Sequence, residues 1–230
     1  MLQVLVWDIA TRLFHWLLVL FVVICLITGE DEGFIFAIHA YAGFVILMLL
    51  FFRTGWGIFG SRHSRFTDFV YSWPTTWRYA LSVFRFKPTR YVGHNPLGGW
   101  MIICMLVVLM ATTLSGILMV TKGAGWLEDI HEALGTFIQF LVFVHIVGVF
   151  VDQFLTGEKI VIAMITGHKA LAEDAAQREV LVTGAGKALA FAAIVVISSV
   201  YLFQQIDYST KVATFSNNHE SEQDRNKDKD

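Results

Sequence analysis

Four of the eight histidines fall inside or at the ends of long apolar segments: His15, His39, His131 and His145. An ionisable side chain at such a position is costly unless it has a partner, so each is a candidate functional residue. His131 and His145 lie fourteen residues apart in the stretch WLEDIHEALGTFIQFLVFVHIVGVF. On one α-helix the two imidazoles would share a face, about 21 Å apart along the axis. Such a helix offers a nitrogen ligand near each face of a bilayer, whose hydrocarbon core is about 30 Å thick.

The composition supports a membrane setting for these histidines. Of 230 residues, 56% are hydrophobic and only 16% are charged, and the apolar residues come in long blocks. Cys25 and Cys104 both lie inside such blocks, which indicates buried packing residues rather than a disulfide or a metal site. The sequence contains no dinucleotide fingerprint, phosphate-binding loop or Cys-x-x-Cys motif, and nothing indicates a nucleic-acid partner. The first apolar block lacks a cleavage pattern, so we expect a retained membrane helix.

Hydropathy predicts five membrane-spanning helices. The fold class expected is all-α, an integral membrane four-helix haem-binding bundle plus a fifth C-terminal transmembrane helix. We expect residues 1–184 to form the four-helix domain, 185–204 the extra helix, and 205–230 a polar, disordered external tail. The predicted spans are approximately residues 9–28, 36–52, 97–120, 128–154 and 187–203.

The charge distribution gives the spans a direction. The long connection from Arg53 to Pro96 carries seven Lys or Arg residues against one acid, Asp68, whereas the short loop after the first span is acidic. The positive-inside rule then places the N-terminus and the long connection in the cytoplasm and the C-terminus outside. Residues 66–86 mix aromatic residues with arginines, which fits either a segment on the membrane surface or an ordinary loop over the bundle.

With these directions the four histidines fall at two depths. His15 and His145 lie toward the cytoplasm, and His39 and His131 lie toward the outside. Two imidazoles on opposing helices at one depth are what bis-histidine ligation of a haem b requires, and helix bundles hold such cofactors between facing helices. The pattern therefore predicts two haem b groups. A zinc or copper site is the competing interpretation, but it needs three or four converging ligands.

Small residues accompany the histidines. Gly43 follows His39 by four positions, Gly135 follows His131 by four, and Gly148 follows His145 by three. A flat macrocycle needs clearance on that face of a helix. Close packing of membrane helices is the alternative reason for glycines here.

Three further side chains are weaker candidates. Arg12 lies one turn before His15 and is either a partner for a haem propionate or a cytoplasmic anchor. His94, in GHNPLGG, either lines a quinone pocket as a proton donor or acceptor or caps the following helix. Lys122 lies in the external connection, where it either attracts an anion or is simply solvated.

Several motifs together resemble the prokaryotic cytochrome b561 family, which includes the b-type cytochrome subunits of nickel–iron hydrogenases. The resemblance covers about Val6 to His168 and rests on VWDIATRLFHW, HAYAG, GHNPLGG, the HEALG…H pair and MITGHK, in that order. The fourteen-residue spacing also resembles that of the formate dehydrogenase membrane subunit. The resemblance implies that His15, His39, His131 and His145 are the iron ligands of a bacterial inner-membrane dihaem protein that exchanges electrons with quinone and a periplasmic partner. The fifth helix and the charged tail depart from the family pattern.

The expected function is therefore electron transfer across the membrane, between quinone and a periplasmic cytochrome c or a dehydrogenase or hydrogenase subunit, with lipid as the surrounding solvent. Whether the chain is an enzyme itself is left open. The alternative is a superoxide:quinone oxidoreductase that acts at the external haem, for which Lys122 is the only hint. A haem-free transporter or assembly factor is a third class, and an absorption spectrum distinguishes it directly.

Overall fold

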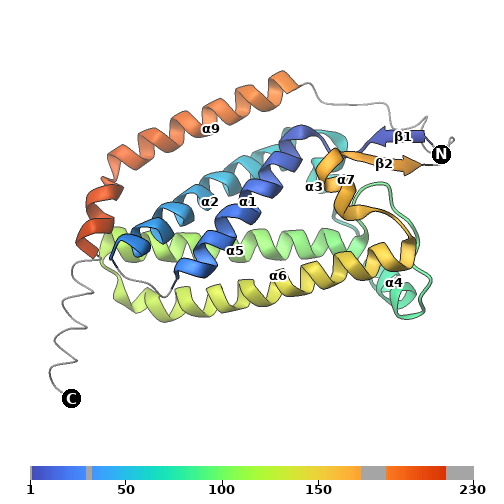
Figure 1. Cartoon of the computed structure of the whole chain (residues 1–230), viewed down its shortest axis with the longest axis horizontal. Coiled ribbons are helices and arrows are strands. Elements are labelled where there is room, and N and C mark those ends of the chain that lie inside the picture. Colours follow the sequence, from blue (N-terminus) through green and yellow to red (C-terminus); the bar gives the residue numbers. More distant parts are fainter. Residues whose placement is uncertain (1, 30–32, 172–184, 216–230) are drawn as a thin grey trace, which may run out of the picture. The chain divides into compact units, whose positions relative to one another are not determined.

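The computed structural model describes residues 2–29, 33–171 and 185–215. Long α-helices dominate, and a short pair of strands accompanies them (Figure 1). The elements in chain order are β1 (Leu2–Leu5), α1 (Ile9–Thr28), α2 (Gly33–Phe59), η1 (Arg62–Ser64), α3 (Phe66–Phe69), α4 (Trp73–Phe84), α5 (Pro96–Lys122), η2 (Gly125–Leu127), α6 (Glu128–Thr156), α7 (Ile160–Thr166), β2 (His168–Leu171) and α9 (Ala185–Gln205).

The predicted all-α membrane fold is confirmed. Five helices of the described chain are long and apolar enough to cross a membrane, namely α1, α2, α5, α6 and α9. The first helix has the predicted bounds, whereas α2 runs seven residues beyond the predicted end at residue 52 and stops at Phe59. The extension matters because it brings Arg53, which we had assigned to the following loop, into a membrane helix.

The chain forms two compact units, and α1, α2, α5, α6 and α9 each contribute a segment to both. Unit 1 contains residues 1–15, 52–107 and 140–191, and unit 2 contains residues 16–51, 108–139 and 192–230. Each of these long helices runs through both units. His15 and His145 belong to unit 1, and His39 and His131 belong to unit 2.

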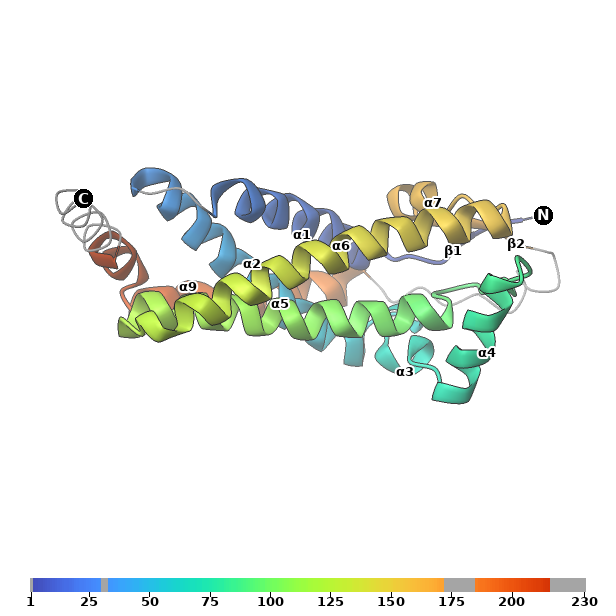
Figure 2. The same cartoon turned by 90° about the horizontal axis from the view of Figure 1, so that it is seen from below.

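Unit 1 contains a two-stranded antiparallel sheet that the sequence did not indicate. β1 pairs with β2 from Leu2–Leu171 to Leu5–His168, and α7 leads into β2 after a short return from the end of α6 (Figures 1 and 2). Gly167 ends α7 in the left-handed region (φ 86°), and its carbonyl accepts hydrogen bonds from the backbone N–H groups of Val6 and Trp7. Buried Lys169 forms an ion pair with Glu158 at 2.6 Å. The segment before α1 is thereby held to the segment after α7.

Asp8 connects the start of α1 to the end of α2. Its carboxylate accepts the backbone N–H of Thr11 at 2.6 Å, which caps α1. It also accepts hydrogen bonds from Trp56 Nε1 at 3.1 Å and from the Ser61 hydroxyl. Asp8, Trp56 and Ser61 are all buried. Because a buried carboxylate is stable only when its oxygens are satisfied, these contacts fix the geometry of this end of unit 1.

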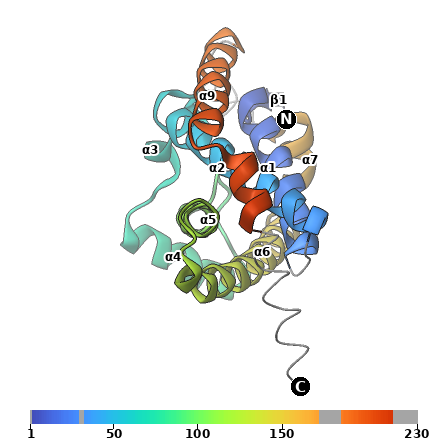
Figure 3. The same cartoon turned by 90° about the vertical axis from the view of Figure 1, so that its left-hand side faces the viewer.

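The core of unit 2 corrects the prediction for the C-terminal tail. We expected a disordered polar tail from Gln205, but residues 208–215 are helical. Tyr208 and Val212 are buried against Ala40, Phe44 and Val120, and Tyr208 donates a hydrogen bond to the carbonyl of Ala40 at 3.1 Å. Figure 3 shows this helix beside α2. The apolar residues of this segment recur at helical spacing, but the segment is polar on average. Composition alone therefore did not indicate a helix here. Residues 216–230 lie outside the described chain.

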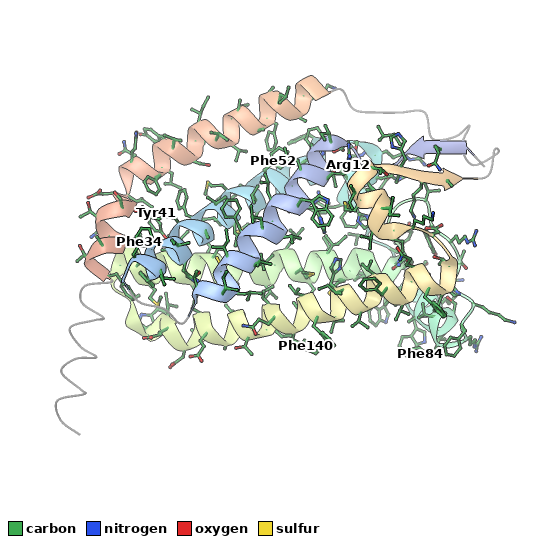
Figure 4. The ribbon with its side chains drawn as sticks, viewed as in Figure 1. Arg12, Phe34, Tyr41, Phe52, Phe84 and Phe140 are labelled. Atoms are coloured by element: carbon green, nitrogen blue, oxygen red, sulfur yellow. The ribbon has the colours of Figure 1, made fainter. Side chains whose placement is uncertain are left out.

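The α4 helix presents large apolar side chains on its outer face. Trp73, Trp77, Leu81 and Phe84 recur at helical spacing and are exposed, whereas Thr76 and Tyr79 are buried on the inner side. Phe84 points away from the helices in Figure 4. Tyr79 fixes the inner side, because its hydroxyl donates to Asp152 of α6 at 2.8 Å. An exposed aromatic face of this kind fits a segment at the membrane surface, one of the two interpretations left open by the sequence.

We expect Asp8→Ala to destabilise unit 1 by about 2–4 kcal/mol, because it removes a helix cap and leaves the buried Trp56 Nε1 without an acceptor. Asp8→Asn is the matched control, since the amide oxygen of the asparagine can still accept some of the hydrogen bonds that the Asp8 carboxylate accepts. The measurement is thermal unfolding in detergent, together with hydrogen exchange at the start of α1. Equal stability of Asp8→Ala and wild type would contradict this role.

Candidate haem sites

In unit 2 the structure brings His39 of α2 against His131 of α6. Their ring centroids lie 6.0 Å apart, and the ring planes are tilted by 78°. Two metal–nitrogen bonds of about 2 Å and two ring radii of roughly 1 Å give a centroid separation of about 6 Å for imidazoles on opposite sides of one metal. The pairing predicted from depth is therefore present, at a spacing that bis-imidazole ligation of an iron can use.

Backbone carbonyls orient both imidazoles. His39 Nδ1 lies 3.1 Å from the carbonyl oxygen of Cys25 on α1. His131 Nδ1 lies 2.9 Å from the carbonyl oxygen of Thr112 on α5 and 3.1 Å from the Ser115 hydroxyl. A carbonyl accepts only from a protonated Nδ1, which leaves Nε2 with its lone pair available for a metal. Helices α1 and α5 thus set the tautomer of ligands carried by α2 and α6.

In unit 1, His15 of α1 and His145 of α6 lie within electrostatic range of each other. Both side chains are partly buried. The second predicted pair thus comes from α1 and α6, and both of its residues lie in unit 1.

The glycines beside the histidines divide into two kinds. A Cβ built at Gly43, Gly135 or Gly148 would meet no described heavy atom within 4 Å, so these positions have open space beside them, as a flat macrocycle requires. A Cβ at Gly116 would lie 2.8 Å from His131 Cε1 and 3.1 Å from its Nδ1. Gly116 was not among the predicted site residues. It allows α5 to approach the imidazole of His131 closely.

His94 occupies a packed position rather than the capping position considered for it. Asn95 caps α5, because its side-chain oxygen accepts the N–H of Gly98 at 2.7 Å. The His94 ring instead packs against Trp7 at 4.4 Å and Phe69 at 4.8 Å between centroids. Burial lowers the pKa of His94 to about 3, and the positive charges of Arg53 and Lys169 act in the same direction. The imidazole is therefore neutral at physiological pH.

The remaining predicted candidates differ in their surroundings. Arg12 Nη1 donates to the carbonyl of Ile165 in α7 at 2.6 Å, so this side chain joins α1 to the segment that follows α6 (Figure 4). Lys122 is exposed in the last turn of α5. Sequence reasoning missed Arg53, which is only 3% exposed within α2. A charge at the end of the apolar run ILMLLFFR was the signal that could have identified it.

The donor set fits haem b. Each unit offers two imidazoles from different helices, with apolar surroundings and small residues beside them. In the described part of the chain, no three His, Cys, Asp or Glu side chains gather as zinc or copper ligation would need. These residues match an iron that takes its equatorial ligands from a porphyrin.

The family comparison agrees with this chemistry. Residues 6–167 match the family model described as prokaryotic cytochrome b561, which covers more than half of the chain. The chain belongs to the prokaryotic cytochrome b561 family. As a member of this family it is a membrane b-type cytochrome, and b-type cytochromes carry haem b.

The relatives of this cytochrome carry one shared name. A "Probable Ni/Fe-hydrogenase B-type cytochrome subunit" of Cupriavidus necator is 26% identical over 210 residues, covering 71% of this chain and 86% of that protein. The protein of the same name from Rhizobium leguminosarum bv. viciae is 24% identical over 212 residues, covering 73% and 89%. A "Probable Ni/Fe-hydrogenase 1 B-type cytochrome subunit" of Escherichia coli K12 is 29% identical over 116 residues, covering 40% and 49%. No solved structure matches this chain.

We expect Gly116→Ala to displace the imidazole of His131 from its hydrogen bond to Thr112, since the added methyl group would lie 2.8 Å from Cε1. The overpacking costs about 1–3 kcal/mol and should lower the haem content of the purified protein. Gly125→Ala is the control, because a Cβ there meets no described atom within 4 Å. Haem content in Gly116→Ala equal to that of the control, measured by pyridine haemochrome, would contradict this prediction.

Proposed function

We propose that this cytochrome carries electrons across the bacterial inner membrane between the quinone pool and a nickel–iron hydrogenase, through two haem b groups. The observation that carries the proposal is the set of two histidine pairs, His39 with His131 and His15 with His145, one pair in each compact unit. One pair would support a single redox centre. Two pairs on one shared helix support a relay.

The haems would supply one-electron redox chemistry at iron, and the chain's own residues determine how they are held. His15 and His145 would ligate the cytoplasmic haem, and His39 and His131 the periplasmic haem. The carbonyls of Cys25 and Thr112 keep Nδ1 of the second pair protonated, which orients its Nε2 atoms. Gly43 and Gly135 leave room beside that pair. The apolar helices exclude water from the ligands.

The continuity of α6 supports transfer from one haem to the other. His131 and His145 both lie within Glu128–Thr156, a single uninterrupted helix. Their fourteen-residue separation corresponds to about 21 Å of helix rise. Helix α6 would therefore be a wall common to both haem sites.

The partner assignment rests on the relatives. Proteins that align with most of this chain are named as hydrogenase cytochrome subunits, and the first two align over 86% and 89% of their own length. A hydrogenase is therefore the proposed electron donor or acceptor. A periplasmic cytochrome c or another dehydrogenase are the competing partners, and they predict different electron donors in a reduction assay.

The quinone is proposed to react on the cytoplasmic side, near Arg12, His15, His94 and His145. His94 lies within electrostatic range of His145 and has a buried Nδ1 with no hydrogen-bond partner among the described residues. A neutral imidazole can accept or donate a hydrogen bond to a quinone oxygen. These features support His94 as the residue that positions the quinone.

The decisive experiment follows haem reduction in proteoliposomes. Hydrogen should reduce the haems only when the hydrogenase is present, and a short-chain quinol should reduce them without it. We expect His94→Gln to keep the haem content of wild type and to slow quinol-driven reduction by on the order of a hundredfold. Reduction by hydrogen that never requires a hydrogenase, or quinol kinetics unchanged in His94→Gln, would contradict the partner and the quinone assignments respectively.

The proposed orientation places the N-terminus in the cytoplasm and the C-terminus in the periplasm. The exposed aromatic face of α4, with basic residues beside it, supports a cytoplasmic surface segment in contact with lipid. We expect a cysteine at Lys87 to react with an impermeant maleimide only from the cytoplasmic side, and a cysteine at Lys122 only from the periplasmic side. The native Cys25 and Cys104 are partly buried in the spans, and the labelling of the wild-type protein gives the background signal from these two residues. The reverse labelling pattern would overturn the orientation.

A further inference from the structure

Arg53 is a charged side chain inside a membrane helix with almost no access to solvent. It lies six residues before the end of α2 at Phe59, and only 3% of its surface is exposed. A guanidinium remains charged at any physiological pH, and burying it without a partner costs several kcal/mol. Its Nη1 has no hydrogen-bond partner in the described part of the chain. This position therefore calls for an anion.

The surroundings of Arg53 do not provide that anion. Its guanidinium lies over the rings of Phe66 at 5.0 Å and Phe69 at 5.6 Å, which contribute only cation–π attraction. Asp8 lies within electrostatic range, but its carboxylate already accepts from Thr11 N, Trp56 Nε1 and Ser61 Oγ. No carboxylate of the described residues makes an ion pair with Arg53.

Two other buried donors of unit 1 also have no acceptor among the described residues. Trp7 Nε1 and Arg12 Nε are buried, and among the described residues neither has a hydrogen-bond partner. Both residues border Gly167, where a built Cβ would lie 2.7 Å from Trp7 O and 3.1 Å from Arg12 Nε. Each unsatisfied buried donor costs about 1–3 kcal/mol, more when it is charged. Unit 1 therefore contains several buried donors without acceptors, and Arg53 carries a charge that no ion pair of the described residues neutralises.

His94 connects this region to the proposed iron ligands. Its ring packs on Trp7 at 4.4 Å and on Phe69, the same ring that Arg53 covers. His94 is also within electrostatic range of both Arg53 and His145. All of these residues belong to unit 1. Trp7, His94, Phe69 and Arg53 therefore form one chain of contacts in the unit that also holds the His15 and His145 pair.

We propose that Arg53 binds a propionate carboxylate of the haem ligated by His15 and His145, with Trp7 Nε1 and Arg12 Nε as further donors. This inference rests on the proposed dihaem function and extends it to the cofactor's periphery. A guanidinium presents parallel N–H groups that match a carboxylate bidentately. A lipid phosphate offers the same anionic oxygens, but the 3% exposure of Arg53 favours a ligand that is buried with the protein.

The first test compares the redox potentials of the two haems in wild type and Arg53→Met. His15→Ala, which should lose the haem held by His15 and His145, identifies the signal of this haem. Removal of a positive charge favours the ferric form, so in Arg53→Met the potential of this haem should fall. The other haem, identified by its loss in His131→Ala, should keep its wild-type potential in Arg53→Met. Resonance Raman propionate-bending bands should shift for the first haem only. Arg53→Lys keeps the charge and should restore most of the potential but not the wild-type propionate band.

Arg78→Met is the matched control, because Arg78 is an exposed arginine on α4, and it should behave as wild type. Wild-type potentials and propionate bands in Arg53→Met would overturn the inference while leaving the dihaem proposal intact. Absence of haem from the wild-type protein would instead overturn the proposed function. If only quinol-driven reduction weakens in Arg53→Met, the acceptor is a quinone oxygen and the inference is also wrong.

A second test compares two ligands within each protein, so that a general loss of haem affinity in the variant cancels. Apoprotein is reconstituted with haem or with its dimethyl ester, which cannot present a carboxylate. At the His15 and His145 site the ester should bind ten- to a hundredfold more weakly than haem to wild type. In Arg53→Met that ratio should fall toward one, as expected for two groups that interact directly. An ester penalty of equal size in both proteins means that a lipid phosphate or water satisfies Arg53, and contradicts the proposal.

Discussion

Hydrocarbon offers no hydrogen-bond partner to a polar group, and this constraint explains the placement of polar side chains in the long helices. His39 and His131 direct Nδ1 to backbone carbonyls of neighbouring helices. Asp8 gathers three donors at the junction of α1 and α2. Arg53 has neither an ion pair nor a hydrogen bond to Nη1 among the described residues, which is why it indicates a missing anion.

The same constraint separates the roles of the helices. In unit 2, α2 and α6 carry the histidines, while α1 and α5 provide the carbonyls that orient them. Gly116 lets α5 come close enough to do so. Conversely, Gly43 and Gly135 keep the faces beside the histidines open. The residues that orient the two histidines therefore differ from the glycines that leave space beside them. Each feature can be altered by mutation without changing the other.

The sequence predicted those features that follow from the free-energy cost of placing polar and charged residues in a membrane. Apolar length alone located five spans, and charge asymmetry predicted that His39 pairs with His131, two residues whose rings lie 6.0 Å apart in the structure. The pairing of His15 with His145 stays a prediction. Other features depend on contacts between distant segments. The pairing of Leu2–Leu5 with His168–Leu171 joins segments more than 160 residues apart and has no local signal. Tyr208 and Val212 are buried by residues of α2 and α5 despite a polar neighbourhood in sequence. Arg53 was missed because the predicted span ended at residue 52, directly before it, whereas α2 continues to Phe59.

The central claim is that one chain holds two bis-histidine haem b groups. Its most direct test is the haem-to-protein ratio of the purified wild-type protein, measured together with its reduced-minus-oxidised spectrum and low-temperature EPR. The account predicts two haem b per chain, both low-spin and titrating as two one-electron centres. A ratio of one or zero, or a high-spin iron with an open coordination position, would contradict it.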